Sequence, residues 1–249
     1  MKETDQYFDG IADKFARNIY GTTKGRLRHI LLLEAMQPFL TQPQRIIEIG
    51  GGTGIMTKAL AEQGHQITLT DASGDVLALA AELLAPFSQV EQQHAPLRSL
   101  TTIDQYDLVV CHAVLEWLAE PFEAIDYLFE QMAPGSRLSL SFFNRDAALF
   151  SNALYGNFDY IGKGLRVKNQ VRLNPTNALR PADVLAHLTG LGFTVLSRSG
   201  IRCFHDYMKD KPADDGKFAE LLALEREYRS TEPFCWLGKY FHVMVQKPG

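Results

Sequence analysis

Short apolar runs alternate with helical patterns through most of the chain, and this alternation limits the possible folds more than any other feature. Seven runs have the length and composition of strands, at residues 45–49, 66–70, 89–93, 107–111, 137–143, 193–199 and 240–245. Helical patterns separate several of them, near residues 54–63, 75–84, 121–132 and 181–192. The sequence therefore predicts an α/β fold, in which a mostly parallel sheet carries helices on both faces.

The composition argues against several classes of protein. Charged residues make up 22% of the chain and the formal net charge is −4, so the chain is globular and, taken as a whole, is no basic nucleic-acid binder. The three cysteines form no C-x-x-C pair, which argues against disulfides and structural zinc. No stretch has the roughly 18 apolar residues of a membrane helix. We expect a cytoplasmic protein with no metal and no membrane contact, and the oligomeric state stays open.

A glycine-rich segment, EIGGGTG from Glu48 to Gly54, follows the first predicted strand and opens a helix. Glycines at such a turn let the backbone approach a ligand closely. The dinucleotide-binding pattern requires a small residue where this chain has Ile55, which disfavours NAD. Asp71 ends the second strand, where a carboxylate can accept hydrogen bonds from two ribose hydroxyls. The alternative is that Asp71 only caps the helix after Ser73.

The glycine spacing resembles the first motif of class I S-adenosylmethionine-dependent methyltransferases. Other runs resemble one family more closely, the bacterial tRNA 5-carboxymethoxyuridine methyltransferases: FARNIYGTTKGRLR (15–28), HAVLEWLAEP (112–121), GNFDYI (156–161), GIRCFHDYM (200–208) and EPFCWLGKYFHV (232–243). The resemblance implies a Rossmann-like, seven-stranded sheet whose last strand is antiparallel. It also implies S-adenosylmethionine as cofactor. The implied reaction methylates the carboxylate of 5-carboxymethoxyuridine at the tRNA wobble position (U34), forming 5-methoxycarbonylmethoxyuridine.

The pattern along the chain predicts the parts of a single domain. Two helical patterns, at 7–19 and 26–40, precede the first strand. Insertions at the carboxyl ends of strands are where open α/β sheets build substrate sites. We expect a single domain, residues 1–249, made of an N-terminal helical cap (1–43), a cofactor-binding half (44–143) and two substrate-side insertions (144–179 and 201–239).

Site residues are assigned from the motif and the resemblance together. Those expected to contact the cofactor are Arg28, Glu48, Gly50, Gly51, Gly52, Gly54, Asp71, Ala95, Pro96 and His112. The acceptor carboxylate, with a pKa of about 4, is already ionised at neutral pH, so it needs orientation and no general base. We expect Arg202 and His205 to orient it, with Tyr240 as an aromatic face for the base.

Two segments without acidic residues, 14–28 and 163–172, are candidates for phosphate contacts. The residues expected to bind tRNA are Tyr155, Lys163, Arg166, Lys168 and Arg172. Two other functions remain open from the sequence. A methyltransferase of a small-molecule or carrier-bound carboxylate would share the fold and cofactor without needing basic segments. A non-catalytic S-adenosylmethionine-binding module for RNA or protein would bind the cofactor and transfer nothing.

Overall fold

The computed structural model of the protein describes residues 5–6, 10, 22–165 and 177–249. Apart from Gly10, the helix expected at 7–19 lies outside these residues. So do three of the expected tRNA-binding residues, Arg166, Lys168 and Arg172.

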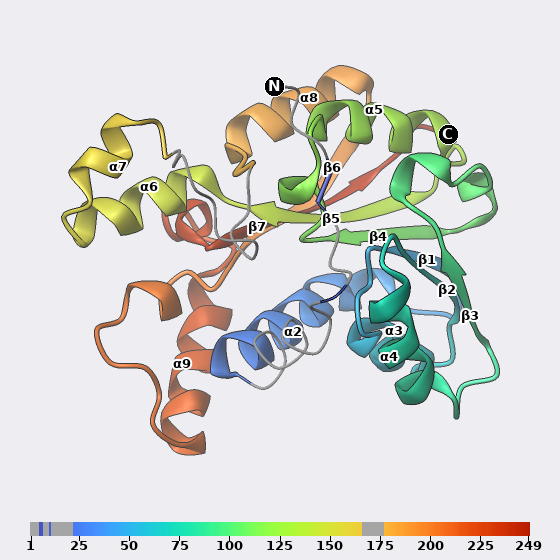
Figure 1. Ribbon diagram of the computed structural model, residues 1–249, viewed down its shortest axis with the longest axis horizontal. Coiled ribbons are helices and arrows are strands. Elements are labelled where there is room, and N and C mark those ends of the chain that lie inside the picture. The colour runs from blue at the N-terminus through green and yellow to red at the C-terminus, as the bar shows by residue number, and fades with distance from the viewer. Residues whose placement is uncertain (1–4, 7–9, 11–21, 166–176) are drawn as a thin grey trace.

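A seven-stranded sheet forms the centre of the molecule (Figure 1). Its strands are β1 (Arg45–Ile49), β2 (Gln66–Asp71), β3 (Val90–His94), β4 (Leu108–His112), β5 (Arg137–Phe143), β6 (Thr194–Ile201) and β7 (Tyr240–Gln246). Their order across the sheet is β3-β2-β1-β4-β5-β7-β6. Strands β1 to β5 run parallel, and β7 lies antiparallel between β5 and β6. The predicted fold class and the antiparallel last strand are confirmed.

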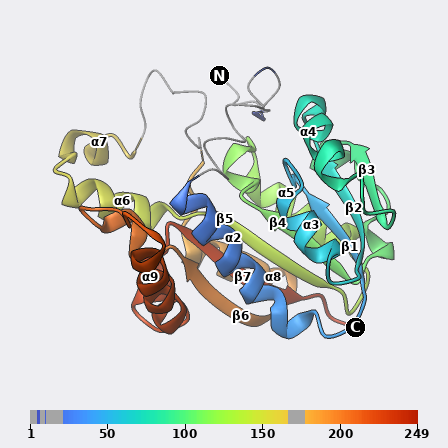
Figure 2. The same ribbon diagram turned by 90° about the horizontal axis from the view of Figure 1, so that it is seen from below.

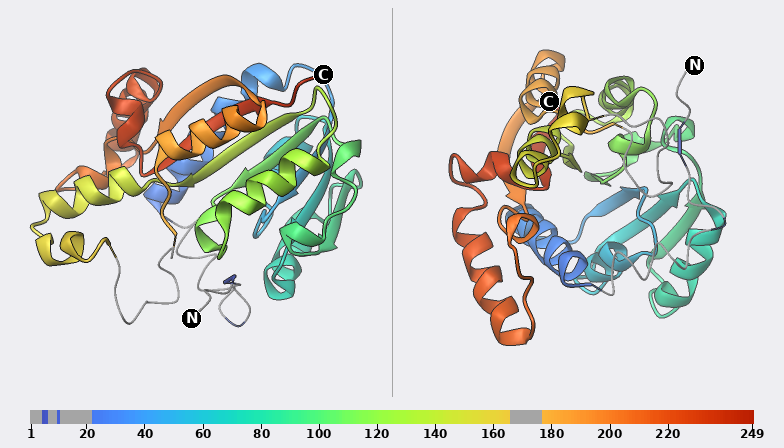
Figure 3. Two further views of the ribbon diagram at one scale, coloured as in Figure 1. Left: turned by 90° about the horizontal axis from the view of Figure 1, so that it is seen from above. Right: turned by 60° about the vertical axis from the view of Figure 1, so that its left-hand side comes forward.

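Helices cover both faces of this sheet. In the described ranges they are α2 (Thr23–Met36), α3 (Ile55–Ala61), α4 (Gly74–Leu84), α5 (Pro121–Gln131), α6 (Arg145–Leu154), α7 (Phe158–Gly162), α8 (Pro181–Leu191) and α9 (Asp215–Tyr228). Figure 3 shows α5 and α8 on one face of the sheet, while α2, α3, α4 and α9 lie on the other. Figure 2 shows α2 lying across β5, β6 and β7. None of the helices among the described residues is long and apolar enough to cross a membrane.

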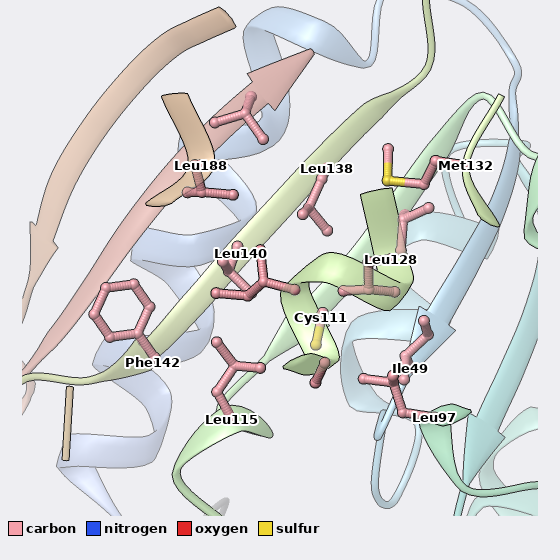
Figure 4. Packing of buried hydrophobic residues seen from close by; sticks show 14 of the residues in the cluster. Ile49, Leu97, Cys111, Leu115, Leu128, Met132, Leu138, Leu140, Phe142 and Leu188 are labelled. Atoms are coloured by element: carbon pink, nitrogen blue, oxygen red, sulfur yellow. The ribbon is translucent and has the colours of Figure 1, made fainter. Parts of the chain in front are cut away.

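The two hydrophobic layers follow from the alternation of side chains along each strand. In β4, Val109 joins the layer under α5 and α8, and its neighbour Val110 joins the layer under α2 and α3. The first layer is shown in Figure 4, where Leu138 and Leu140 of β5 pack near Leu128 of α5. Both faces of the central strands are therefore buried, as a parallel sheet between helices requires.

Several helix ends follow from single residues. Pro181 begins α8 and Gly192, with φ of +104°, ends it, as the sequence predicts. The pattern expected at 26–40 is wrong at both of its ends. Thr22 starts α2 earlier by accepting a hydrogen bond from the Gly25 N–H at 3.2 Å. The α-helix stops at Met36 and continues only as a 3-10 turn, because Pro38 has no N–H to donate to the preceding turn.

Candidate cofactor site and the cationic cluster beside it

A cavity of about 280 Å³ opens at the carboxyl ends of β1, β2 and β4. Strand β1 has β2 on one side and β4 on the other, so the order of the strands reverses at β1. Open α/β sheets bind ligands at such a switch point. Nine of the ten residues expected to contact a cofactor line this cavity: Arg28, Glu48, Gly50, Gly51, Gly52, Asp71, Ala95, Pro96 and His112. The sequence therefore places most of its candidate cofactor residues in one cavity.

The glycine loop after β1 is packed so tightly that two of its positions exclude side chains. A Cβ atom on Gly50, whose φ is +66°, would lie 2.4 Å from Val114. A Cβ atom on Gly51 would lie 2.2 Å from Leu69. The N–H groups of Gly50 and Gly51 donate to the Thr70 carbonyl at 2.8 and 3.1 Å. The loop is thus fixed against β2, and its main chain forms a wall of the cavity.

Gly54 is the expected cofactor residue that does not line the cavity. It precedes α3 with φ of +79°, and a Cβ atom there would lie 2.8 Å from Leu84 of α4. This glycine lets α3 and α4 pack closely, which is a role in packing that the motif spacing alone does not distinguish from ligand contact.

The Asp71 carboxylate joins two segments at the cavity. Its Oδ2 accepts a hydrogen bond from the Gly52 N–H at 3.0 Å, and its Oδ1 accepts one from the Ser73 N–H at 2.9 Å. Ser73 itself caps α4 by accepting a hydrogen bond from the Val76 N–H at 3.4 Å, so helix capping does not account for Asp71. The Asp71 carbonyl accepts from the Ala95 N–H at 2.9 Å, which brings the loop after β3 to the same cavity.

Glu48 lies beneath the glycine loop and is buried. Burial raises the pKa of its carboxyl to about 7, although a hydrogen bond from the Thr57 hydroxyl opposes the shift. The Glu48 side chain also lies 2.8 Å from where a Cβ atom on Gly51 would be. Glu48 therefore supports the loop from below and is a buried acid that can hold a proton near neutral pH.

The raised pKa of Glu48 predicts a change of stability with pH. Between about pH 4.5 and pH 7 the folded protein holds a proton that the unfolded chain releases, so this group lowers the free energy of unfolding as pH rises through that window. Glutamine cannot titrate, so the free energy of unfolding of Glu48→Gln should lack this pH dependence. Relative to the wild type, it should rise by on the order of 2 kcal/mol from pH 5 to pH 8. Urea unfolding at both pH values measures the difference. Glu82→Gln, at an exposed position, should show no such change. If the free energies of unfolding of Glu48→Gln and the wild type differ by the same amount at pH 5 and pH 8, the prediction is wrong.

A chain of hydrogen bonds runs from the cavity into the sheet. His112 Nε2 lies 2.8 Å from the Ser139 hydroxyl, which lies 2.9 Å from His242 Nε2, so three adjacent strands are joined. Burial, with the nearby charge of His242 and Arg28, holds the pKa of His112 well below its ordinary value, and burial lowers the pKa of His242 to about 3. Both imidazoles are therefore neutral near pH 7, and His112 meets the cavity as an uncharged ring.

Cationic groups surround Tyr240, which also lines the cavity. The guanidinium carbons of Arg28 and Arg202 lie 5.4 and 5.5 Å from the centre of its ring. Arg202 is buried, with φ of +65°, and pairs with Asp206 through Nε at 2.8 Å and Nη2 at 3.1 Å. Burial alone would raise the pKa of Asp206, but the hydrogen bond from His205 and the charge of Arg202 lower it to about 2. The expected orienting residue Arg202 thus already has an anionic partner.

The loop that carries Arg202 and His205 is held by a buried carboxylate of α9. Glu225 accepts hydrogen bonds from the N–H groups of Cys203 at 2.6 Å, Phe204 at 3.0 Å and His205 at 3.1 Å. Its side chain is fully buried. His205 is buried in this arrangement and does not line the cavity. No sequence pattern pointed to Glu225, because its partners lie about twenty residues away in the chain.

The remaining expected tRNA residues lie away from the cavity. Tyr155 follows α6 with 62% of its surface exposed, and Lys163 follows α7 (Figure 1). Neither lines the cavity. Sequence reasoning missed other residues that line it, among them Gln6, His29 and Trp117. Trp117 stands in the run HAVLEWLAEP, so the resemblance could have indicated it, but the sequence holds no signal for Gln6, whose N–H donates to the Trp117 carbonyl at 2.9 Å.

Known structures share this fold. A magnesium protoporphyrin IX methyltransferase from Synechocystis PCC 6803, solved with bound SAH, aligns with a TM-score of 0.63 at 19% identity over 97% of this chain and 96% of that one. A possible histamine N-methyltransferase from Thermotoga maritima aligns with a TM-score of 0.65 at 14% identity over 96% and 97% of the two chains. Residues 22–193 match the family described as a methyltransferase domain. Fold and site together define a class I S-adenosylmethionine-dependent methyltransferase.

Sequence comparison narrows the class further. The tRNA 5-carboxymethoxyuridine methyltransferase of Escherichia coli (strain K12) is 37% identical over 98% of this chain and 97% of its own length. The chain belongs to the family of tRNA 5-carboxymethoxyuridine methyltransferases.

Proposed function

We propose that the protein transfers a methyl group from S-adenosylmethionine to the carboxylate of 5-carboxymethoxyuridine at the wobble position (U34) of tRNA, forming 5-methoxycarbonylmethoxyuridine. The observation that carries the proposal is the cationic cluster at Tyr240, a residue that also lines the cofactor cavity. Positive charge beside a methyl-donor site suits an anionic acceptor. A tRNA substrate would also be met in the cytoplasm.

The residues that line the cavity fit the parts of S-adenosylmethionine. Gly50 and Gly51 let the loop pack directly against Val114 and Leu69, so that its main chain forms a wall of the cavity against which a ligand can lie. Asp71 is the carboxylate for the ribose hydroxyls, and Ala95 and Pro96 would flank the adenine. Arg28 would pair with the carboxylate of the amino acid part of the cofactor.

The cofactor supplies an electrophilic methyl group on a sulfonium, and the protein has to position the acceptor. An ionised carboxylate is already a nucleophile, so no side chain needs to remove a proton. Neutral His112 adds no positive charge next to a cationic sulfonium. The protein's contribution is then alignment of the reacting groups, which is worth several kcal/mol in well-oriented reactions. Tyr240 offers an aromatic face for the uracil ring, and Tyr155 and Lys163 remain candidates for tRNA contact.

Transfer to isolated tRNA tests the proposed function. tRNA from cells that lack this protein, incubated with the purified protein and S-adenosylmethionine, should lose 5-carboxymethoxyuridine and gain its methyl ester in nucleoside analysis by mass spectrometry. tRNA without the carboxymethoxy group should gain nothing. Methylation of a free carboxylic acid with tRNA unchanged would indicate a small-molecule methyltransferase. Cofactor binding without transfer to either would indicate a non-catalytic binding module.

A further inference from the structure

An aromatic pair with three cationic groups lies at the edge of the cofactor cavity. Phe143 and Tyr240 face each other across β5 and β7, with ring centres 5.7 Å apart and planes at 79°. The guanidinium groups of Arg28 and Arg202 lie over the Tyr240 ring, as described above. The ammonium nitrogen of Lys239 lies 4.8 Å from the centre of the Phe143 ring. Lys239 stands in the run EPFCWLGKYFHV, but sequence reasoning gave it no role.

The three cations differ in what already neutralises them. Arg202 forms two contacts with Asp206, and Arg28 lies near the buried Glu116. Among the described residues, no carboxylate lies within 4.0 Å of the Lys239 ammonium group, although the residue is partly buried. Burial lowers the pKa of Lys239; Asp206 opposes the shift, and Arg202 and Lys24 add to it. An anion bound at this ammonium group would therefore remove an electrostatic cost.

The main chain fixes Lys239 firmly. Its N–H donates to the Arg202 carbonyl at 3.1 Å, and its own carbonyl accepts from the Asn144 N–H at 3.1 Å. The next residue, Tyr240, lines the cofactor cavity. Lys239 thus directly precedes the first residue of β7, on a backbone held by both substrate-side insertions. It does not itself line the cavity; its ammonium group lies over Phe143, whose ring contacts that of the lining residue Tyr240.

We propose that Lys239 is a substrate-binding residue that holds one oxygen of the acceptor carboxylate. A lysine ammonium group is a compact point charge, so it can pair with one carboxylate oxygen and leave the other free to attack the methyl group. An arginine fork that is already occupied by Asp206 is less suited to this task. This inference rests on the proposed function and changes the assignment of Arg202, which becomes a neighbour that orders Asp206 and Tyr240.

The test compares the binding of two tRNAs. Lys239→Met should weaken binding of tRNA that carries 5-carboxymethoxyuridine by about tenfold or more and raise its KM similarly, because a charge-assisted hydrogen bond is lost. Binding of the same tRNA with unmodified uridine at the wobble position should stay unchanged, as should the affinity for S-adenosylhomocysteine. Lys239→Arg, which keeps the charge, should recover part of the loss. The exposed Lys217→Met, on α9, is the matched control and should behave as the wild type.

Two outcomes would overturn the assignment. Equal weakening of both tRNAs would mean that Lys239 contacts a phosphate, and unchanged binding of both would mean that it contacts no substrate anion. If Lys239→Met no longer binds S-adenosylhomocysteine, Lys239→Gln replaces it with the same two outcomes. A wild-type protein that methylates no tRNA would instead contradict the proposed function. An active wild type together with a Lys239→Met variant that binds and methylates the tRNA equally well would contradict only this inference.

Discussion

Gly51→Ala is expected to weaken the binding of S-adenosylmethionine and S-adenosylhomocysteine by roughly 5- to 150-fold, the equivalent of about 1–3 kcal/mol of overpacking. The new methyl group would meet the Leu69 side chain at 2.2 Å and the Glu48 carboxyl carbon at 2.8 Å, and both belong to the packed layer beneath the loop. The loop can relieve these contacts only by moving toward the cavity that it lines. Calorimetric titration with S-adenosylhomocysteine measures the loss.

Gly190→Ala is the matched control for this prediction. A Cβ atom at Gly190, in α8, has no heavy atom within 4 Å, and alanine stabilises a helix relative to glycine by roughly 0.5–1 kcal/mol. The control should bind the cofactor as the wild type does and unfold at an equal or higher temperature. Unaltered affinity of Gly51→Ala would show that the glycine loop does not form the cofactor wall.

Glu225→Ala is expected to lower the free energy of unfolding by about 3 kcal/mol or more, because three backbone N–H groups lose their acceptor in a buried place. Glu225→Ala should also lower the rate of methyl transfer. The freed loop carries Arg202, whose carbonyl holds the Lys239 N–H. Glu225→Gln, which keeps one acceptor oxygen, should fall between the alanine variant and the wild type. Urea unfolding measures stability, and the methyl-transfer assay at 10–20 °C measures turnover of the folded fraction.

The exposed Glu227→Ala, on the same helix, is the control for Glu225. Its change in stability should stay within about 0.5 kcal/mol, as for most surface substitutions. An equally small effect of Glu225→Ala would mean that water or a rearranged loop satisfies the three N–H groups, and that the buried carboxylate does not fix the loop.

The sheet and the cofactor wall were predictable because their signals are local. The strands at 45–49 and 137–143 begin and end where predicted, since apolar runs with polar flanks set both ends. The glycine loop and Asp71 meet in one cavity because the ends of adjacent parallel strands lie together. The end of α2 was missed because the effect of Pro38 depends on how the preceding turn closes.

The cationic cluster was only partly predictable, since its contacts join distant segments. Sequence reasoning selected Arg202 and Tyr240 but gave no indication that Asp206 occupies the Arg202 fork. The contact of Lys239 could not be predicted without the pairing of β7 with β5, which places its ammonium group over the Phe143 ring. Glu225 acts across a separation of about twenty residues on a loop with no regular period. Chemistry that depends on such long-range neighbours leaves no periodic trace in the chain.

The position of β7 has a consequence for assembly. It follows β6 and α9 in the sequence, yet in the finished sheet it separates β5 from β6. Until β7 is in place, β6 has no partner strand and β5 keeps an open hydrogen-bonding edge. The cofactor half can therefore assemble early from nearby strands, whereas the part of the cavity wall that Tyr240 forms is completed only when β7 enters and closes the sheet.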